Sequence, residues 1–144
     1  MSRTHDLAWC AGFFDGEGFV TIQNRKSKVK GKVYEGYYLR IGINHVAPEP
    51  LLEMQRVLGG TIRQQTAHTV IGNRKQRHTW QMGCQAAKEA LIQMMPYFRN
   101  KQKVAELGIE LQNTMGNHGQ RVTPELQLLR SMLKEEISNL NNKD

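Results

Sequence analysis

The sequence contains little cysteine and no long apolar run, and both shortages exclude classes of protein. Its two cysteines, Cys10 and Cys84, each lie within an apolar pattern, so we expect buried thiols in a reducing compartment and no disulfide framework. The five histidines are scattered and lack a second cysteine pair, which argues against a zinc knuckle. No apolar stretch approaches the roughly 20 residues that span a bilayer, so we expect no membrane partner.

The start of the chain lacks the features of a targeting signal. Residues 1–6 contain no apolar segment followed by a cleavage site, so we expect no secretion signal and an intracellular protein, in the cytoplasm or an organelle matrix. Hydrophobic residues make up 39% and charged residues 23% of the 144 positions, which is typical of a globular chain. This length predicts a single domain, 1–144.

Acidic residues are too few to balance the basic ones, and the formal net charge is +7. A basic surplus favours polyanionic partners, either nucleic acid or an acidic membrane surface. The excess is concentrated in residues 25–40 and 63–78, both in the first part of the chain. The geometry of these two segments therefore matters for function.

Hydrophobic periodicity predicts the elements of the first half. A helix is expected from Leu7 through Phe14, capped by Thr4 or Asp6 and stopped by Gly16 and Gly18. Alternating patterns over 19–25 and 38–44 predict half-buried strands on either side of a basic loop centred on Gly31. A helix over 51–58, closed by two glycines, comes before a second strand pair at 61–65 and 77–84.

The second half is predicted to be helical. Helices are expected over about 86–95, 97–111 and 123–141, the last beginning with a threonine cap and a proline in its first turn. The resulting order, α-β-β-α-β-β-α-α-α, predicts an α+β fold. In it, an antiparallel sheet of about four strands is covered by helices on one face.

The other face of this sheet is predicted to be polar and basic. A single polar strand face is usually just solvated, but four such faces beside two basic segments favour a surface that reads DNA. A ribbon of strands fits the major groove, where arginine pairs with guanine and glutamine with adenine. The candidate DNA-binding residues are Thr21, Gln23, Arg25, Tyr38, Arg40, Thr61, Arg63, Gln65, Arg77, Thr79 and Gln81.

The stretch AWCAGFFDGEGFV at residues 8–20 combines a helix with an acidic turn. Ala8, Gly12 and Gly16 recur every four residues, with Ala11 beside them, so one helix face is nearly bare. Such a face fits tightly either against the chain's own core or against a second copy of the helix. In a two-fold pair the acidic turns lie side by side, and the gathered carboxylates suit Mg²⁺.

Two segments carry a resemblance to a known family. Residues 11–18, AGFFDGEG, resemble the signature of the LAGLIDADG homing endonucleases, with Cys10 in place of the leading leucine and Glu17 in place of the second aspartate. Residues 96–105, PYFRNKQKVA, resemble the C-terminal segment of that family, which leads to a lysine of the catalytic centre. The resemblance covers about residues 6–112.

The resemblance implies a LAGLIDADG-type α-β-β-α-β-β-α core with a saddle-shaped sheet, followed by a helix over 123–141 that only packs. It implies that Glu17 and the Gly16 carbonyl bind the metal, that Asp15 is mainly structural, and that Lys101 lies near the scissile phosphates. The water-positioning residue of the family corresponds to Asn44 or His45, between which the proline-containing segment leaves the alignment open.

The function implied is site-specific cleavage of double-stranded DNA. One signature per chain predicts a homodimer, meeting through Ala8, Ala11 and Gly12, that cuts a long and roughly palindromic site with Mg²⁺, for which Mn²⁺ substitutes. A first alternative is a DNA- or RNA-binding protein on the same scaffold without cleavage, such as an intron maturase or a repressor. A second, a binder of membrane surfaces or acidic proteins, explains the charge but not the acidic turn.

Overall fold

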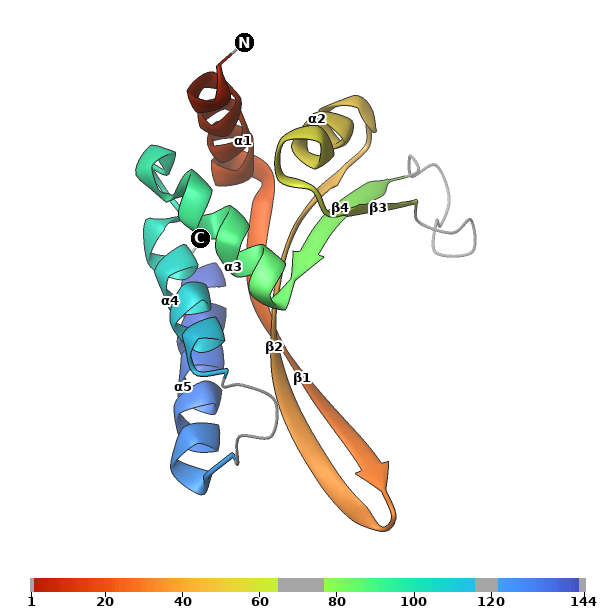
Figure 1. Cartoon of the computed structure of the whole chain (residues 1–144), viewed down its shortest axis with the longest axis vertical. Coiled ribbons are helices and arrows are strands. Elements are labelled where there is room, and N and C mark those ends of the chain that lie inside the picture. The colour runs from red at the N-terminus through yellow and green to blue at the C-terminus, as the bar shows by residue number, and fades with distance from the viewer. Residues whose placement is uncertain (1, 65–76, 116–121, 143–144) are drawn as a thin grey trace.

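The computed structural model describes residues 2–64, 77–115 and 122–142. Its single four-stranded sheet is antiparallel in the order β1-β2-β4-β3, and the predicted α+β class is confirmed. Helices lie on one side of the sheet, and the opposite side, called the outer face below, is left open (Figure 1). The elements are α1 (Arg3–Glu17), β1 (Gly18–Val29), β2 (Lys32–His45), α2 (Glu49–Leu58), β3 (Thr61–Gln64), β4 (His78–Gly83), α3 (Cys84–Met94), η2 (Met95–Tyr97), α4 (Gln102–Asn113) and α5 (Pro124–Asn141).

Alternation along β1 and β2 directs apolar side chains into the core. Val20, Leu39, Ile41 and Ile43 are all at most 1% exposed on the helix side. Trp80 from β4 is fully buried among them, and its indole N–H donates to the Gly59 carbonyl at 2.8 Å. This burial fixes the register of the sheet, because a slip by one residue would turn the apolar set to the outer face.

Helix α1 is longer than the sequence predicts at both ends. Ser2, and not Thr4 or Asp6, is the N-cap, and its hydroxyl accepts a hydrogen bond from the His5 amide at 3.2 Å. The first turn is polar, so the apolar pattern marks only the second turn onward. Gly16 remains helical, and the helix ends only at Glu17, with Gly18 as its C-cap.

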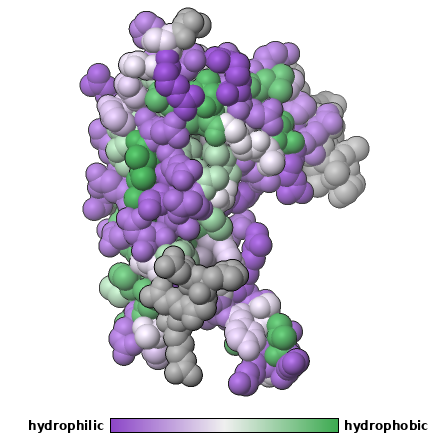
Figure 2. Space-filling view, viewed as in Figure 1, coloured by the Kyte–Doolittle hydropathy of each residue, from purple (hydrophilic) through white to green (hydrophobic). Residues whose placement is uncertain are grey.

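The segment centred on Gly31 is the end of a long hairpin and not an extended loop. Lys30 and Gly31 both have positive φ, 51° and 80°, and form the two-residue turn that matches the twist of the flanking strands. Strand pairing continues to Val29 and Lys32, where residues are exposed on both faces and show no apolar alternation. Only the end of the hairpin therefore extends away from the helices, beyond the point where the Gln127 amide of α5 donates to the Glu35 carbonyl at 2.9 Å (Figures 1 and 2).

Two predictions near the third and fourth helices are wrong. Helix α3 begins at Cys84, which has a φ of 55° and an exposed side chain, so only Cys10 is a buried thiol. The helix expected from Tyr97 begins at Gln102, after a short turn of 3-10 helix and an irregular segment over 98–101.

Helix α5 is attached to the rest of the fold by polar contacts as well as apolar ones. The buried Arg130 guanidinium donates to the hydroxyl and the carbonyl of Thr114, at 2.9 and 2.8 Å. Burial lowers the pKa of Arg130 from its ordinary value. The Asn141 amide donates to the Val20 carbonyl of β1 at 3.0 Å. Across the described ranges, no helix is both long and apolar enough to cross a membrane.

Candidate nucleic-acid interface and metal centre

The acidic turn, residues 15–18, lies where α1 passes into β1. Glu17 and Gly16 are both exposed there, and no basic residue lies in the last turn of the helix. The final carbonyl groups of a helix lack partners within it, and the helix dipole places partial negative charge at this end. A carboxylate and free carbonyl oxygens at a negative helix terminus make a suitable environment for a hard cation.

Asp15 connects this turn to the start of α4. Its carboxylate accepts hydrogen bonds from the backbone amides of Arg99 (2.6 Å), Asn100 (3.1 Å) and Lys101 (2.9 Å). Lys101 is the N-cap residue of α4 and makes no side-chain cap, and Asp15 fixes the three residues that lead into the helix. The bonds hold Lys101 beside the acidic turn. The catalytic role of Lys101 stays a prediction.

Asn44 lies next to the acidic turn on the outer face. The strand register that pairs Gly18 with Ile43, continued by one residue, places Asn44 beside Glu17. The Thr79 hydroxyl, on β4, donates to the Asn44 amide oxygen at 2.6 Å, so both side chains are on the outer face. The oxygen of this amide is thus engaged, and its N–H groups stay available.

His45 follows Asn44 and points to the opposite side of the sheet, as successive strand residues do. Its ring lies edge-on against Phe13 of α1, with centroids 5.5 Å apart, and its Nδ1 lies 3.1 Å from the backbone of Ala47. The position of Asn44 therefore suits a water-positioning role better than that of His45, and the role itself stays a prediction.

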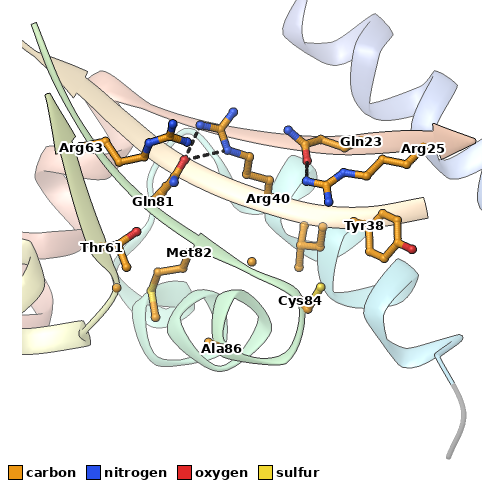
Figure 3. A pocket seen from close by; sticks show the side chains of 13 residues that line it. Gln23, Arg25, Tyr38, Arg40, Thr61, Arg63, Gln81, Met82, Cys84 and Ala86 are labelled. Atoms are coloured by element: carbon orange, nitrogen blue, oxygen red, sulfur yellow. Dashed lines mark hydrogen bonds between the residues drawn. The ribbon is translucent and has the colours of Figure 1, made fainter. Parts of the chain in front are cut away.

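The candidate DNA-binding residues occupy a continuous area of the outer face. Thr79 alone is buried, at 9% exposure, because it bonds to Asn44. Arg77 is exposed and precedes β4, and Gln65 lies outside the described residues. A groove on this face is lined by much of the set, together with the beginning of α3. The candidates that line it are Gln23, Arg25, Tyr38, Arg40, Thr61, Arg63 and Gln81 (Figure 3).

Two arginines in this groove hold defined positions that the sequence analysis did not foresee. Arg40 donates to the amide oxygen of Gln81, and Arg25 donates to that of Gln23. The first contact joins two residues that are 41 positions apart in the sequence and lie on different strands, and no local pattern indicates it. The available signal was Gly42, whose cross-strand partner is Phe19, and Gly36, which lies two residues from Tyr38 on the same strand. Glycine in a strand often marks a close approach.

The small residues of α1 divide between two faces of the helix. Ala8, Gly12 and Gly16 are exposed, and Trp9 beside them is 45% exposed. Ala11 does not belong to this face, because it is fully buried in the chain's own core. Its offset of three residues from Ala8 turns it about 60° around the helix, toward the sheet. The prediction that Ala11 belongs to the bare face is therefore wrong.

The acidic turn provides too few ligands for a metal ion on its own. In the part of the chain that the structure describes, no three side chains of His, Cys, Asp or Glu are gathered as a metal site. One copy offers the Glu17 carboxylate and the carbonyl groups around Gly16. Such a donor set suits a cation only when other oxygens, from a second copy or a phosphate group, complete the shell.

Comparison with known proteins places the chain in a family. The family described as LAGLIDADG endonuclease matches residues 10–106, two thirds of the sequence. The chain belongs to the LAGLIDADG endonuclease family. It is accordingly a site-specific DNA endonuclease by family, and the match includes both the acidic turn and Lys101.

Solved structures with the same fold include several homing endonucleases. I-CvuI in complex with the I-CreI target is 19% identical, with a TM-score of 0.77 over 99% of this chain and 85% of that one. The archaeal intron-encoded I-Vdi141I, complexed with DNA, is 16% identical, with a TM-score of 0.71 over 99% and 88%. I-TnaI is 15% identical, with a TM-score of 0.60 over 95% of this chain and 96% of that one. No curated protein sequence matches the chain.

Proposed function

We propose that this chain acts inside the cell as a homodimer that hydrolyses both strands of a long, roughly palindromic DNA site. Each copy supplies one acidic turn and one outer face, so a two-fold pair presents two cutting centres and two half-sites. The proposed cofactor is Mg²⁺, with Mn²⁺ as a substitute.

The open glycines of α1 are the observation that carries the homodimer. A β-carbon added to Gly12 or Gly16 would meet nothing within 4 Å in this chain. Each glycine costs about 0.8–1.0 kcal/mol relative to alanine inside a helix, so the chain's own packing gives no reason for them. A second helix lying close against this face gives that reason, because only small residues allow two backbones to approach.

The metal would be held by Glu17 and the Gly16 carbonyl of each copy. The chemistry that a divalent ion would supply at this place is a lowered pKa for a water molecule and neutralisation of charge on phosphate oxygens. Lys101, fixed next to the turn by Asp15, adds positive charge where negative charge builds up during hydrolysis. Asn44, whose amide N–H groups remain available, orients the attacking water.

DNA binding is assigned to the outer face. The net charge of +7 and the exposed lysines of the long hairpin supply contacts to the phosphates, which fix the position of the duplex without reading its sequence. The long hairpin, with lysines at 26, 28, 30 and 32, lengthens this surface beyond the body of the protein. A long half-site follows from that length.

The decisive experiment is Mg²⁺-dependent cleavage of a site selected from random DNA, with Glu17→Gln as the test variant. We expect cutting to fall about a hundredfold or more while DNA affinity changes little, because the variant keeps the size of the side chain and loses its charge. Glu135→Gln, on α5, removes an exposed carboxylate elsewhere and should cut normally. Unchanged cleavage by the Glu17 variant would refute the site. Binding without cleavage by the unmodified chain would support a maturase or a repressor.

A further inference from the structure

The Arg40–Gln81 pair is held in place by a chain of supports on the outer face. The Arg40 guanidinium lies over the Phe19 ring, 5.2 Å from its centroid, and its Nε and one Nη donate to the Gln81 oxygen at 3.1 and 2.5 Å. The Phe19 ring occupies the space above its cross-strand partner Gly42, where an added β-carbon would lie 2.6 Å from the Trp80 carbonyl oxygen and 2.7 Å from the ring. A glycine thus makes room for the aromatic ring that supports the arginine.

The Arg25–Gln23 pair repeats this arrangement further along the hairpin. The Arg25 guanidinium lies 5.2 Å from the centroid of the Tyr38 ring and donates to the Gln23 oxygen at 2.9 Å. The Tyr38 ring lies over Gly36, where an added β-carbon would come within 2.6 Å of the tyrosine. Both arginine–glutamine pairs line one groove (Figure 3), and each arginine lies over an aromatic ring that a glycine accommodates.

Hydrogen-bond capacity decides what the Arg40–Gln81 pair can recognise. A guanidinium only donates, so the glutamine must turn its oxygen toward Arg40 and its NH₂ group away. Both lone pairs of the Gln81 oxygen are used, because Arg40 places two N–H groups on it. The pair therefore offers only donors. An isolated glutamine offers adenine one donor and one acceptor, and Gln81 has lost that acceptor.

Guanine is the base that a donor-only pair fits. Its major-groove edge presents two acceptors, O6 and N7, whereas adenine presents one acceptor and one donor. In the Arg25–Gln23 pair only one N–H reaches the glutamine oxygen, so one acceptor site stays open and discrimination should be weaker. Arg40 on β2 pairs with Thr21 on β1, and Thr21 is four residues from Arg25 along that strand. That is about 13 Å, or roughly three to four base-pair steps.

We infer that the Arg40–Gln81 and Arg25–Gln23 pairs are specificity determinants that each read a guanine in the major groove of the half-site. This inference rests on the proposed binding of duplex DNA by the outer face. It predicts two guanines on each half-site, about three to four base pairs apart, with the more strictly required one nearer the acidic turn. By two-fold symmetry the same two positions recur, inverted, in the other half-site.

The test is a selection of bound sites from a random duplex DNA library by the full chain, followed by affinities for every single-base change. We expect the Arg40→Met variant to lose the preference for guanine at one position only, by about tenfold to a hundredfold, the range of a bidentate contact. Arg25→Met should do the same, less strongly, at the second position. The variant Lys134→Met removes one positive charge from α5 and should leave every base preference unchanged.

The Gln81→Glu variant tests the donor argument without disturbing the support of Arg40. Its carboxylate still accepts from Arg40 but has no N–H groups, so guanine should be favoured less and cytosine, which offers a donor, should gain. If the arginine variants lost affinity equally for all four bases, the arginines would contact phosphates and not bases, and the inference would be overturned. A selected site that lacks the two guanines would overturn the inference but would not contradict the proposed cleavage of DNA. If no sequence is enriched at all, the proposed function fails with it.

Discussion

The two faces of α1 use small residues for opposite reasons. On the inner face Cys10 and Ala11 are fully buried beside Phe14, so their size is dictated by the chain's own core. On the open face, Gly12 and Gly16 have no neighbours that would limit a larger side chain. The contrast separates a face whose residues are set by the chain's own core from the face that the proposed dimer would use. Substitutions on each face should therefore affect different measurements.

The largest expected effect comes from filling the open face. Gly12→Leu should abolish double-strand cleavage, because a leucine would hold two α1 helices too far apart for both acidic turns to act together. Folding of the single chain should be retained or improved by up to about 1 kcal/mol, since leucine favours a helix over glycine. Light scattering after gel filtration would report the loss of the dimer, and nicking assays the loss of cutting.

A matched variant sharpens this result. Gly12→Ala adds one methyl group and should keep most of the dimer and the activity. If Gly12→Leu still cut both strands as a dimer, the open face would have to serve some other purpose than self-association.

The inner face should show the opposite pattern, with a large cost in stability. Phe14 is fully buried, with its ring 5.7 Å from that of Phe98 and 6.5 Å from that of Trp80, measured between centroids. Truncating it in Phe14→Ala should lower the free energy of unfolding by about 3–5 kcal/mol. Urea denaturation measures the change, with Trp9→Ala as the control from the open face. Trp9 is 45% exposed, so its truncation should cost the single chain far less; similar costs would remove the contrast.

Within the acidic turn, Asp15 and Glu17 should differ as the two faces of the helix do. Asp15→Asn replaces a charged acceptor of three backbone amides and should cost about 2 kcal/mol, the scale of hydrogen bonds to charged groups. Hydrogen exchange at residues 99–101 should accelerate. Glu17 makes no hydrogen bond or ion pair among the described residues, so Glu17→Gln should leave stability unchanged while it stops cutting. Equal stability for both variants would contradict the role of Asp15 in fixing residues 99–101.

Local patterns sufficed for the parts of the fold that neighbouring residues determine. The apolar alternation of β1 and β2, the glycines after α2 and the cap of α5 by Thr123 were all predictable, and so was the α+β order. The hairpin between Arg25 and Tyr38 was underestimated because exposed strand ends carry no apolar signal. Its two-residue turn at Lys30 and Gly31 is what continues the pairing.

Contacts between distant residues set the limit of prediction. Helix α4 begins at Gln102 and not at Tyr97 because Asp15, 84 to 86 positions earlier, accepts the amides of residues 99–101. The Arg40–Gln81 pair depends likewise on the register of β2 against β4. A pattern within one segment can name such residues as candidates, but it cannot say which of them meet.

The smallest expected effect again separates a buried group from an exposed one, this time by pH. Burial, and then the nearby Asp6 carboxylate, raise the pKa of the Cys10 thiol from 9.0 to about 11. The Cys10 thiol therefore keeps its proton in the folded state at a pH where it loses that proton in the unfolded chain. This contribution to stability is complete below pH 9 and is lost as the pH rises toward 11, by about 1 kcal/mol at pH 10.

The variant Cys10→Ala isolates this contribution. Its constant cost from lost packing does not change with pH, whereas the slope of stability between pH 9 and 11 should be flatter than in the unmodified chain. Cys84→Ala, which removes an exposed thiol, is the matched control. Urea titrations at several pH values would measure both slopes. Parallel curves for all three proteins would show that the Cys10 side of α1 is open to solvent, and the distinction between the two helix faces would no longer hold.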